Sequence, residues 1–177
     1  MPRFTGRREV ARRKQRLQAI FDEIAGVELT PELVSHYSRY LAVIVSGHAE
    51  QSIKELVQEY TRKHSDQRIQ RHIGREIKKF QNVTQEKLKQ LIESFDPEWW
   101  NQIIESRVDE LAALDSVTAV RNSIAHGQDT GITLSHVAEY FRQVSVVLDD
   151  LTASIPLDGT QSAQRSPPLS QPISESD

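Results

Sequence analysis

Apolar side chains recur along this chain at intervals of three and four residues, the spacing that places them on one face of an α-helix. The first such stripe predicts a helix that ends at Gly26. Thr30 and Pro31 then predict the start of a long second helix, with Thr30 as its N-cap and Pro31 in its first turn. The β-branched run Val43–Val45 would also suit a strand, but helical spacing continues on both sides of it, so we expect a helix throughout.

Capping residues divide the rest of the chain into shorter helices. A polar stretch at 64–67 ends the second helix, a short basic helix follows, and each later helix begins after a side chain that can accept a hydrogen bond from the first turn. These expected N-caps are Asn82 or Thr84, then Asp96 before Pro97, and finally Thr133 or Ser135. An apolar stripe at 103–124 fits one helix or two with a break near residue 107, and Gly127 is placed to end it in the left-handed conformation.

The chain shows no internal repeat and no convincing strand pattern, so we expect an all-α protein. After about residue 155 it becomes rich in Pro, Ser and Gln and poor in apolar side chains, which predicts a disordered tail. The expected organisation is a basic N-terminal arm over 1–16 that leads into the first helix, a helical domain over 17–155, and the tail over 156–177.

Positive charge is concentrated in the N-terminal arm. Residues 1–16 hold seven Arg and Lys side chains and one acid, so they carry +6, and because the whole chain carries −3 the remainder carries −9. Such an arm can attract the phosphate groups of RNA. It can equally be a solvated, partly helical leader, and the sequence leaves both interpretations open.

Composition excludes several classes of function. The absence of cysteine rules out disulfides, thiolate metal sites and a cysteine nucleophile, and it fits a cytoplasmic location better than a secreted one. The longest apolar run is the five residues at 41–45, far below the roughly 20 that a membrane helix needs, and no signal peptide is evident. The histidines show no metal-ligand spacing and no glycine-rich phosphate loop occurs, so we expect neither a metal nor a cofactor.

The stretch V-R-N-S-I-A-H-G at 120–127 gathers three polar side chains at the end of a predicted helix. Asn122 and His126 are four residues apart and share a face, whereas Arg121 lies about 140° round the helix from His126 but is long enough to bend back. One interpretation is structural: a histidine at a helix C-terminus, an arginine in an ion pair and an asparagine in a hydrogen bond. The other is catalytic.

The catalytic interpretation is cleavage of RNA by its own 2′-hydroxyl without a metal ion. An imidazole, with a pKa of about 6.5, can take the 2′-OH proton or protonate the leaving 5′-oxygen. A guanidinium stabilises the charge on the non-bridging phosphate oxygens, and an asparagine can orient the phosphate or the imidazole. Because one such set holds a single histidine, an acid and a base together require two copies, which a symmetric dimer supplies.

This motif resembles the Arg-x(4–6)-His signature of the HEPN superfamily, and the chain is similar to the RiboL-PSP-HEPN family within it. Three further segments match in order, at 40–56, 94–99 and 131–141, and the resemblance spans about residues 30–151. It implies a HEPN-like antiparallel helical bundle with extra helices, and a metal-independent endoribonuclease that acts on RNA as a homodimer. By the same resemblance, the catalytic residues are Arg121, Asn122 and His126.

The resemblance also suggests a biological setting and an alternative. Proteins of this kind often act as toxins or in defence against phage, which implies an antitoxin or another regulatory partner. The superfamily also contains catalytically inactive dimeric modules that bind RNA or a partner protein, and this is the alternative function that we carry forward.

Two further groups of residues are candidates for supporting roles. Glu50, on the long second helix, can hold Arg121 or His126 in position, or it can simply pair with Lys54 at i+4. Gly47 beside it would allow another helix to approach closely. The basic segment at 68–80 carries cations off its apolar stripe, which can follow the phosphates of RNA or form an ordinary solvated face; they are Arg71, Arg75, Lys78 and Lys79.

The adjacent tryptophans, Trp99 and Trp100, also allow two interpretations. They can form a stacking platform for bases. Such a pair more often anchors a helix in the core, which is what we expect here.

Overall fold

A computed structural model describes residues 6–104 and 107–157 of the chain. Within these ranges the chain forms seven α-helices and one 3-10 turn, and no strand, which confirms the all-α expectation. In chain order they are α1 (Gly6–Ala25), α2 (Pro31–His64), α3 (Gln67–Glu76), η1 (Ile77–Lys79), α4 (Gln85–Glu93), α5 (Pro97–Ile104), α6 (Val108–Ala125) and α7 (Leu134–Ser154). The expected C-terminal tail lies, from residue 158 onward, outside the described residues.

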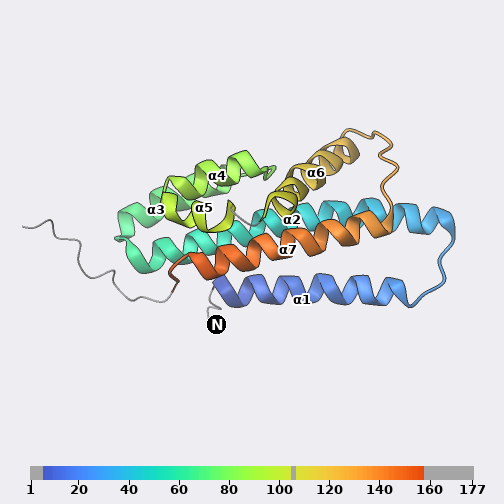
Figure 1. The fold of residues 1–177 in the computed structure, drawn as a ribbon, viewed down its shortest axis with the longest axis horizontal. Coiled ribbons are helices and arrows are strands. Elements are labelled where there is room, and N and C mark those ends of the chain that lie inside the picture. Colours follow the sequence, from blue (N-terminus) through green and yellow to red (C-terminus); the bar gives the residue numbers. More distant parts are fainter. Residues whose placement is uncertain (1–5, 105–106, 158–177) are drawn as a thin grey trace, which may run out of the picture.

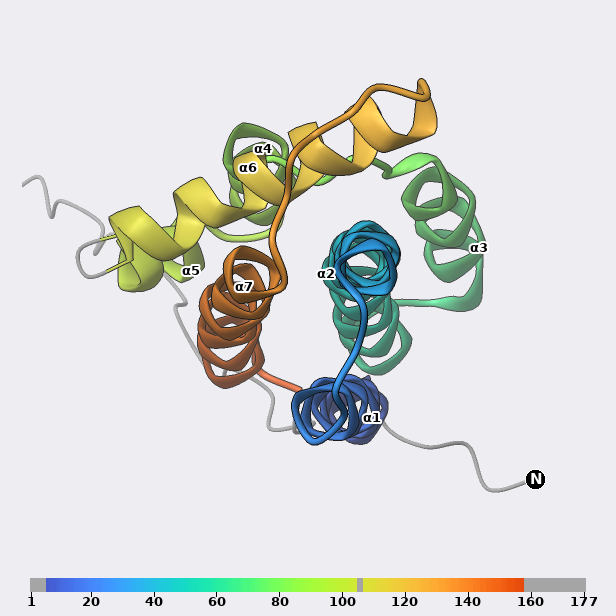
Figure 2. The same cartoon turned by 90° about the vertical axis from the view of Figure 1, so that its right-hand side faces the viewer.

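The long helix α2 organises the molecule. It packs against both α1 and α7 along the long axis; α1 runs opposite to it, whereas α2 and α7 run in the same direction (Figure 1). Viewed end on, α6 packs across α2 and α7 on the side away from α1 (Figure 2). The short helices α3, α4 and α5 gather at the end where α2 finishes (Figure 1). The helix α6 therefore projects its C-terminal end away from this cluster.

The apolar stripes predicted from the sequence meet in one core between these helices. Leu41, Val45 and Leu56 of α2 are almost completely buried against apolar side chains of α1, α6 and α7. Trp99 and Trp100 of α5 are also buried, so the expectation that this pair packs in the core is confirmed. Burial of this apolar surface is the main favourable contribution to folding.

Side-chain caps decide where several helices begin. Thr30, Thr84 and Thr133 each accept a hydrogen bond from a backbone N–H in the first turn that follows, which selects Thr84 over Asn82 and Thr133 over Ser135. Asp96 accepts from the N–H of Glu98 at 2.9 Å, in the role of the expected cap. Because α5 ends at Ile104 and α6 begins at Val108, the long apolar stripe belongs to two helices.

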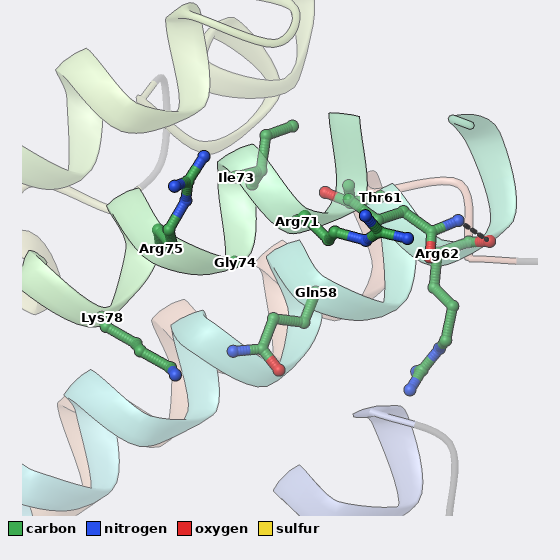
Figure 3. A pocket seen from close by; sticks show the side chains of 9 residues that line it. Gln58, Thr61, Arg62, Arg71, Ile73, Gly74, Arg75 and Lys78 are labelled. Carbon is green, nitrogen blue, oxygen red and sulfur yellow. Dashed lines mark hydrogen bonds between the residues drawn. The ribbon is translucent and has the colours of Figure 1, made fainter. Parts of the chain in front are cut away.

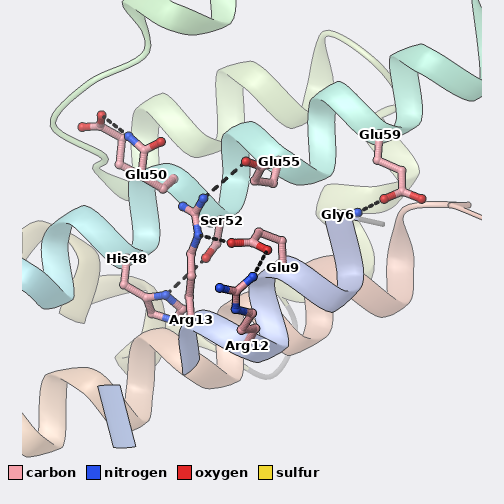
Figure 4. Close-up of polar contacts among 10 residues, drawn as sticks. Gly6, Glu9, Arg12, Arg13, His48, Glu50, Ser52, Glu55 and Glu59 are labelled. Carbon is pink, nitrogen blue, oxygen red and sulfur yellow. Dashed lines mark hydrogen bonds and ion pairs between the residues drawn. The ribbon is translucent and has the colours of Figure 1, made fainter. Parts of the chain in front are cut away.

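The first helix starts in close contact with α2. The backbone N–H of Gly6 donates to the carboxylate of Glu59, which is almost completely buried (Figure 4). A Cβ atom at Gly6 would lie 2.8 Å from both the carbonyl oxygen of Glu55 and Oε2 of Glu59, so only glycine fits without a shift of the neighbours.

The described part of the basic N-terminal segment is therefore the first half of a packed helix. Its Val10 is buried in the core. Arg13 lies 3.3 Å from a carboxylate oxygen of Glu55 on α2 (Figure 4), and Lys14 lies 2.6 Å from one of Asp149 on α7. These contacts favour the interpretation of this segment as a helical leader; where the domain begins remains a prediction.

Candidate active site

The motif at 120–127 forms the last turn of α6. His126 is the C-cap, with φ −91° and ψ 11°, and its N–H donates to the carbonyl oxygen of Asn122. Gly127 follows with φ +71°. Its N–H donates to the carbonyl oxygen of Ile124, and the N–H of Gln128 donates to the carbonyl oxygen of Ser123. This pair of hydrogen bonds is the Schellman motif, in which a left-handed glycine ends the helix. The predicted helix end is confirmed, and it leaves the His126 side chain exposed.

Arg121 and Asn122 are linked by their side chains. Nη1 of Arg121 donates to Oδ1 of Asn122 at 3.1 Å, and both residues are half-buried. Asn122 is also one helical turn before His126, on the same face of α6. The arginine thus bends towards the face that carries the histidine, as its side-chain length allows.

A second asparagine, which the sequence did not single out for this site, also binds Arg121. Nη1 of Arg121 also donates to Oδ1 of Asn82 at 3.0 Å. Asn82 lies in the linker between η1 and α4 and has φ +53°, a left-handed conformation that asparagine tolerates better than most residues. Its position before a capping threonine suggested only a helix cap, so its contact with Arg121 depends on tertiary structure.

Glu50 reaches this site through Asn82. One of its carboxylate oxygens accepts from Nζ of Lys54 at 2.8 Å, which is the i+4 pair that the simpler interpretation predicted. The other accepts from the backbone N–H of Asn82 at 3.3 Å. Glu50 therefore supports the residue that holds Arg121, and a positioning role towards Arg121 remains a proposal.

The linker that carries Asn82 is tied to α6 at two further points. The hydroxyl of Thr118 donates to the carbonyl oxygen of Val83 at 2.6 Å in the buried interior. The N–H of Gln85 donates to Oδ1 of Asp115 at 2.9 Å. Because Thr118 and Asp115 lie one and two turns before Arg121 on α6, the linker and the arginine are held in a defined relation to each other.

The loop after His126 is anchored to the N-terminal half of α2. Asp129 accepts from Arg39 at 2.7 Å and from the N–H of Gly131 at 3.4 Å. The hydrogen bond from the N–H of Gly131, and after it the positive charge of Arg39, lower the pKa of the Asp129 carboxyl below its usual value. The end of α6 therefore lies beside the exposed side of α2.

The expectation for Gly47 is wrong. Nothing lies within 4 Å of the position that a Cβ atom would occupy there, and the residue is exposed. Gly47 lines an open hollow between α2 and α1, whereas α6 and the linker pack on the neighbouring face of α2, where Glu50 lies.

The four basic residues at 71–79 are not all in one place. Arg71, Arg75 and Lys78 line a groove between α2 and the α3–η1 segment (Figure 3). Lys79 is instead held by Glu76, with Nζ at 2.8 and 3.0 Å from the two carboxylate oxygens, and lines a different cavity.

His48 is a buried titratable group close to, but not part of, the candidate site. Its Nδ1 is 3.3 Å from Oγ of Ser52, and its Nε2 is buried with no hydrogen-bond partner (Figure 4). Burial, reinforced by the positive charges of Arg13 and Lys14, lowers the pKa of His48 to about 4. The ring is therefore neutral near pH 7, and it has a structural position between α1 and α2.

The described residues contain neither a metal-binding cluster nor a membrane-spanning helix. No group of three or more His, Asp or Glu side chains within 6–104 and 107–157 is arranged to hold a metal ion. In the same part of the chain, no helix has the length and hydropathy required to span a membrane.

Comparison with known proteins assigns the family. The sequence model of the RiboL-PSP-HEPN family matches residues 8–155, which covers every helix from α1 to α7. The chain belongs to this family, and the expected resemblance is confirmed. Neither the curated proteins nor the solved structures gave a match.

Proposed function

We propose that this protein is a metal-independent endoribonuclease whose active site is completed by a second copy of the chain. The observation that carries the proposal is the arrangement at the end of α6: an exposed imidazole at His126, one turn from an asparagine whose side chain binds Arg121. Membership of a HEPN family agrees with an RNA-related function of this kind. The biological role that we infer is that of a toxin or a phage-defence protein, kept inactive by an antitoxin or regulator.

The reaction that fits these groups is an internal transfer at phosphorus. His126 of one copy takes the proton from the ribose 2′-hydroxyl, and the 2′-oxygen forms a bond to phosphorus. The bond from phosphorus to the 5′-oxygen breaks, and the leaving oxygen receives a proton from the other imidazole. The products are a 2′,3′-cyclic phosphate and a 5′-hydroxyl, so no water and no metal enters this step.

Arg121 and Asn122 have distinct roles in this proposal. Nη1 of Arg121 binds both Asn82 and Asn122, and the other N–H groups of the guanidinium stabilise the charge on the non-bridging phosphate oxygens. Asn122 keeps the guanidinium turned towards the face of α6 that carries His126. A guanidinium that is already fixed in place loses less freedom when it binds the transition state.

A second copy is required because one protomer supplies one histidine at this position. The exposed side of α2 suits such a contact: Leu33, Tyr37 and Tyr40 are 45%, 39% and 55% exposed, unusually high for large apolar side chains. Arg39, next to Tyr40, binds the loop that follows His126. Pairing two copies through this side of α2 would therefore place the two α6 ends near each other.

A catalytically inactive RNA-binding or partner-binding dimer is the second candidate. The observation in its favour is that Arg121 is half-buried and already bonded to two amide oxygens, as a purely structural arginine would be. In that function the motif would stabilise the end of α6 and would have no catalytic role.

Incubation of the purified protein with mixed RNA in EDTA separates the two candidates. The proposal expects cleavage with 5′-hydroxyl and 2′,3′-cyclic phosphate ends, and its loss in His126→Ala. Because His126 is exposed, this substitution should change the free energy of unfolding by less than about 1 kcal/mol. The nuclease proposal would be overturned in favour of the binding module if a protein shown to be dimeric left the RNA intact both in EDTA and with added Mg²⁺.

A further inference from the structure

The groove between the C-terminal half of α2 and the α3–η1 segment has a volume of about 670 Å³. One wall is α2, with Gln58, Thr61 and Arg62; the other is α3 and η1, with Arg71, Arg75 and Lys78. Ile73 of α3 also lines it, and Nε2 of Gln70 donates to the carbonyl oxygens of Arg62 and Ser65, which fixes α3 against the end of α2. The two walls are therefore held apart by packing and hydrogen bonds within the fold.

The side chains that line this groove carry a net positive charge. Four cationic side chains and no carboxylate line it. The nearest acids are engaged elsewhere: Glu76 binds Lys79, and the buried Glu59 binds Lys63 at 2.9 Å and the N–H of Gly6. Arg62 lies 3.8 Å from Glu59, whereas Arg71, Arg75 and Lys78 have no ion pair within 4 Å in the described chain. Such a cluster gains free energy when it binds an anionic ligand, because the like charges repel each other without one.

The cations are distributed along the groove rather than gathered at one anion site. Figure 3 shows its cations following one another from Lys78, past Arg75 and Arg71, to Arg62. Lys78 is at the end nearer to Asn82 and hence to Arg121. Glu50, at the candidate active site, and Arg62 are twelve residues apart on α2, which corresponds to about 18 Å at a rise of about 1.5 Å per residue.

We propose that this groove binds the phosphate backbone of single-stranded RNA on one side of the bond that is cleaved at the end of α6. The inference rests on the proposed ribonuclease function for the identity of the ligand as RNA. At roughly 3.4 Å per stacked nucleotide, the distance along α2 corresponds to about five nucleotides. Cation contacts of this kind read charge and spacing and do not discriminate between bases.

The test measures binding separately from cleavage. The full-length His126→Ala protein is titrated with a fluorescent single-stranded RNA of about eight nucleotides at several salt concentrations. Combining Arg71→Gln, Arg75→Gln and Lys78→Gln should weaken binding by a factor of ten or more, on the order of one charged hydrogen bond. It should also reduce the slope of log K against log salt by about 2, since each phosphate contact in a single strand contributes about 0.7.

Lys79→Gln is the matched control, because it removes the same charge from the next residue outside the groove. It should leave the slope unchanged. An unchanged slope in the triple variant would overturn the groove assignment. The proposed function would stay intact in that case if the same three substitutions, made with His126 present, left RNA cleavage unchanged. Equally tight binding of poly-glutamate would overturn RNA as the specific ligand. Failure of the His126→Ala dimer to bind RNA at all, together with no cleavage by the wild type, would remove the proposed function as well.

Discussion

Nη1 of Arg121 donates to Oδ1 of Asn82 at 3.0 Å, which joins the motif helix α6 to a linker 39 residues earlier in the chain. The same linker residue donates its backbone N–H to Glu50 of α2. Arg121 is therefore positioned by a chain of contacts that involves three separate segments. This relationship leads to the first prediction.

Replacing Asn82 by glycine should impair catalysis more than folding. Glycine keeps the left-handed φ of +53° without strain but removes the oxygen that binds Arg121. We expect kcat for RNA cleavage to fall by about tenfold to a hundredfold with little change in KM, because Arg121 loses its orientation. The free energy of unfolding should fall by roughly 1–2 kcal/mol. Asn82→Asp, which retains the acceptor, is the control: equal losses of kcat in both variants would contradict a positioning role.

Replacing Tyr40 by glutamate should disrupt the proposed dimer. Tyr40 is 55% exposed on the apolar side of α2, so the substitution adds a charge there without opening a cavity in the protomer. Sedimentation or light scattering should show that the dimer of this variant has a dissociation constant at least tenfold higher than that of the wild type. RNA cleavage should be lost in parallel. Val108→Glu provides the control, because Val108 is 73% exposed at the other end of α6. A Tyr40→Glu protein that dimerises normally would show that this side of α2 is not the interface.

His48 should make the stability of the protein depend on pH in the acidic range. Its pKa falls from about 6.5, the ordinary value of a histidine, to about 4 in the fold, so between these values the unfolded chain binds a proton that the native chain does not. The free energy of unfolding should therefore be greatest above pH 6.5 and decrease as pH falls towards 4, by roughly 3 kcal/mol from this group.

Urea denaturation at a series of pH values measures this effect. His48→Gln should show a smaller decrease between pH 6.5 and 4, whereas substitution of the exposed His72 should retain the full decrease. The charged groups that face His48 are Arg13 and Lys14 from α1 and Asp149 from α7. An identical decrease in the wild type and in His48→Gln would assign the pH dependence to other groups.

Two glycine-to-alanine substitutions should have opposite effects on stability. At Gly6 a methyl group would collide with the backbone of Glu55 and the carboxylate of Glu59, so Gly6→Ala should lower the free energy of unfolding by about 1–3 kcal/mol. At Gly74 nothing lies within 4 Å, so Gly74→Ala should raise it by up to about 1 kcal/mol through helix propensity. Thermal unfolding measures both, and a stabilised Gly6→Ala protein would contradict the packed start of α1.

The helices themselves were largely predictable because they depend on local interactions. Apolar spacing, threonine caps and the left-handed Gly127 act within one or two turns, and they placed the ends of α2, α6 and α7 correctly. The alternatives that stayed open, such as Asn82 or Thr84, concern residues that are adjacent in sequence and similar in capping chemistry. The structure decided between them because Asn82 turns its side chain to Arg121.

The candidate site also has a part that follows from local sequence and a part that depends on tertiary packing. The sequence alone determined that Asn122 and His126 share a face at the end of a helix, because residues four apart lie one above the other, and that the long side chain of Arg121 is near enough to bend towards them. Only the tertiary structure decided that Asn82 and Glu50 join them, that nothing packs closely on Gly47, and that Lys79 is outside the groove of Lys78. The physical reason is that these relations depend on how helices from distant parts of the chain pack, and that packing is determined by the whole core.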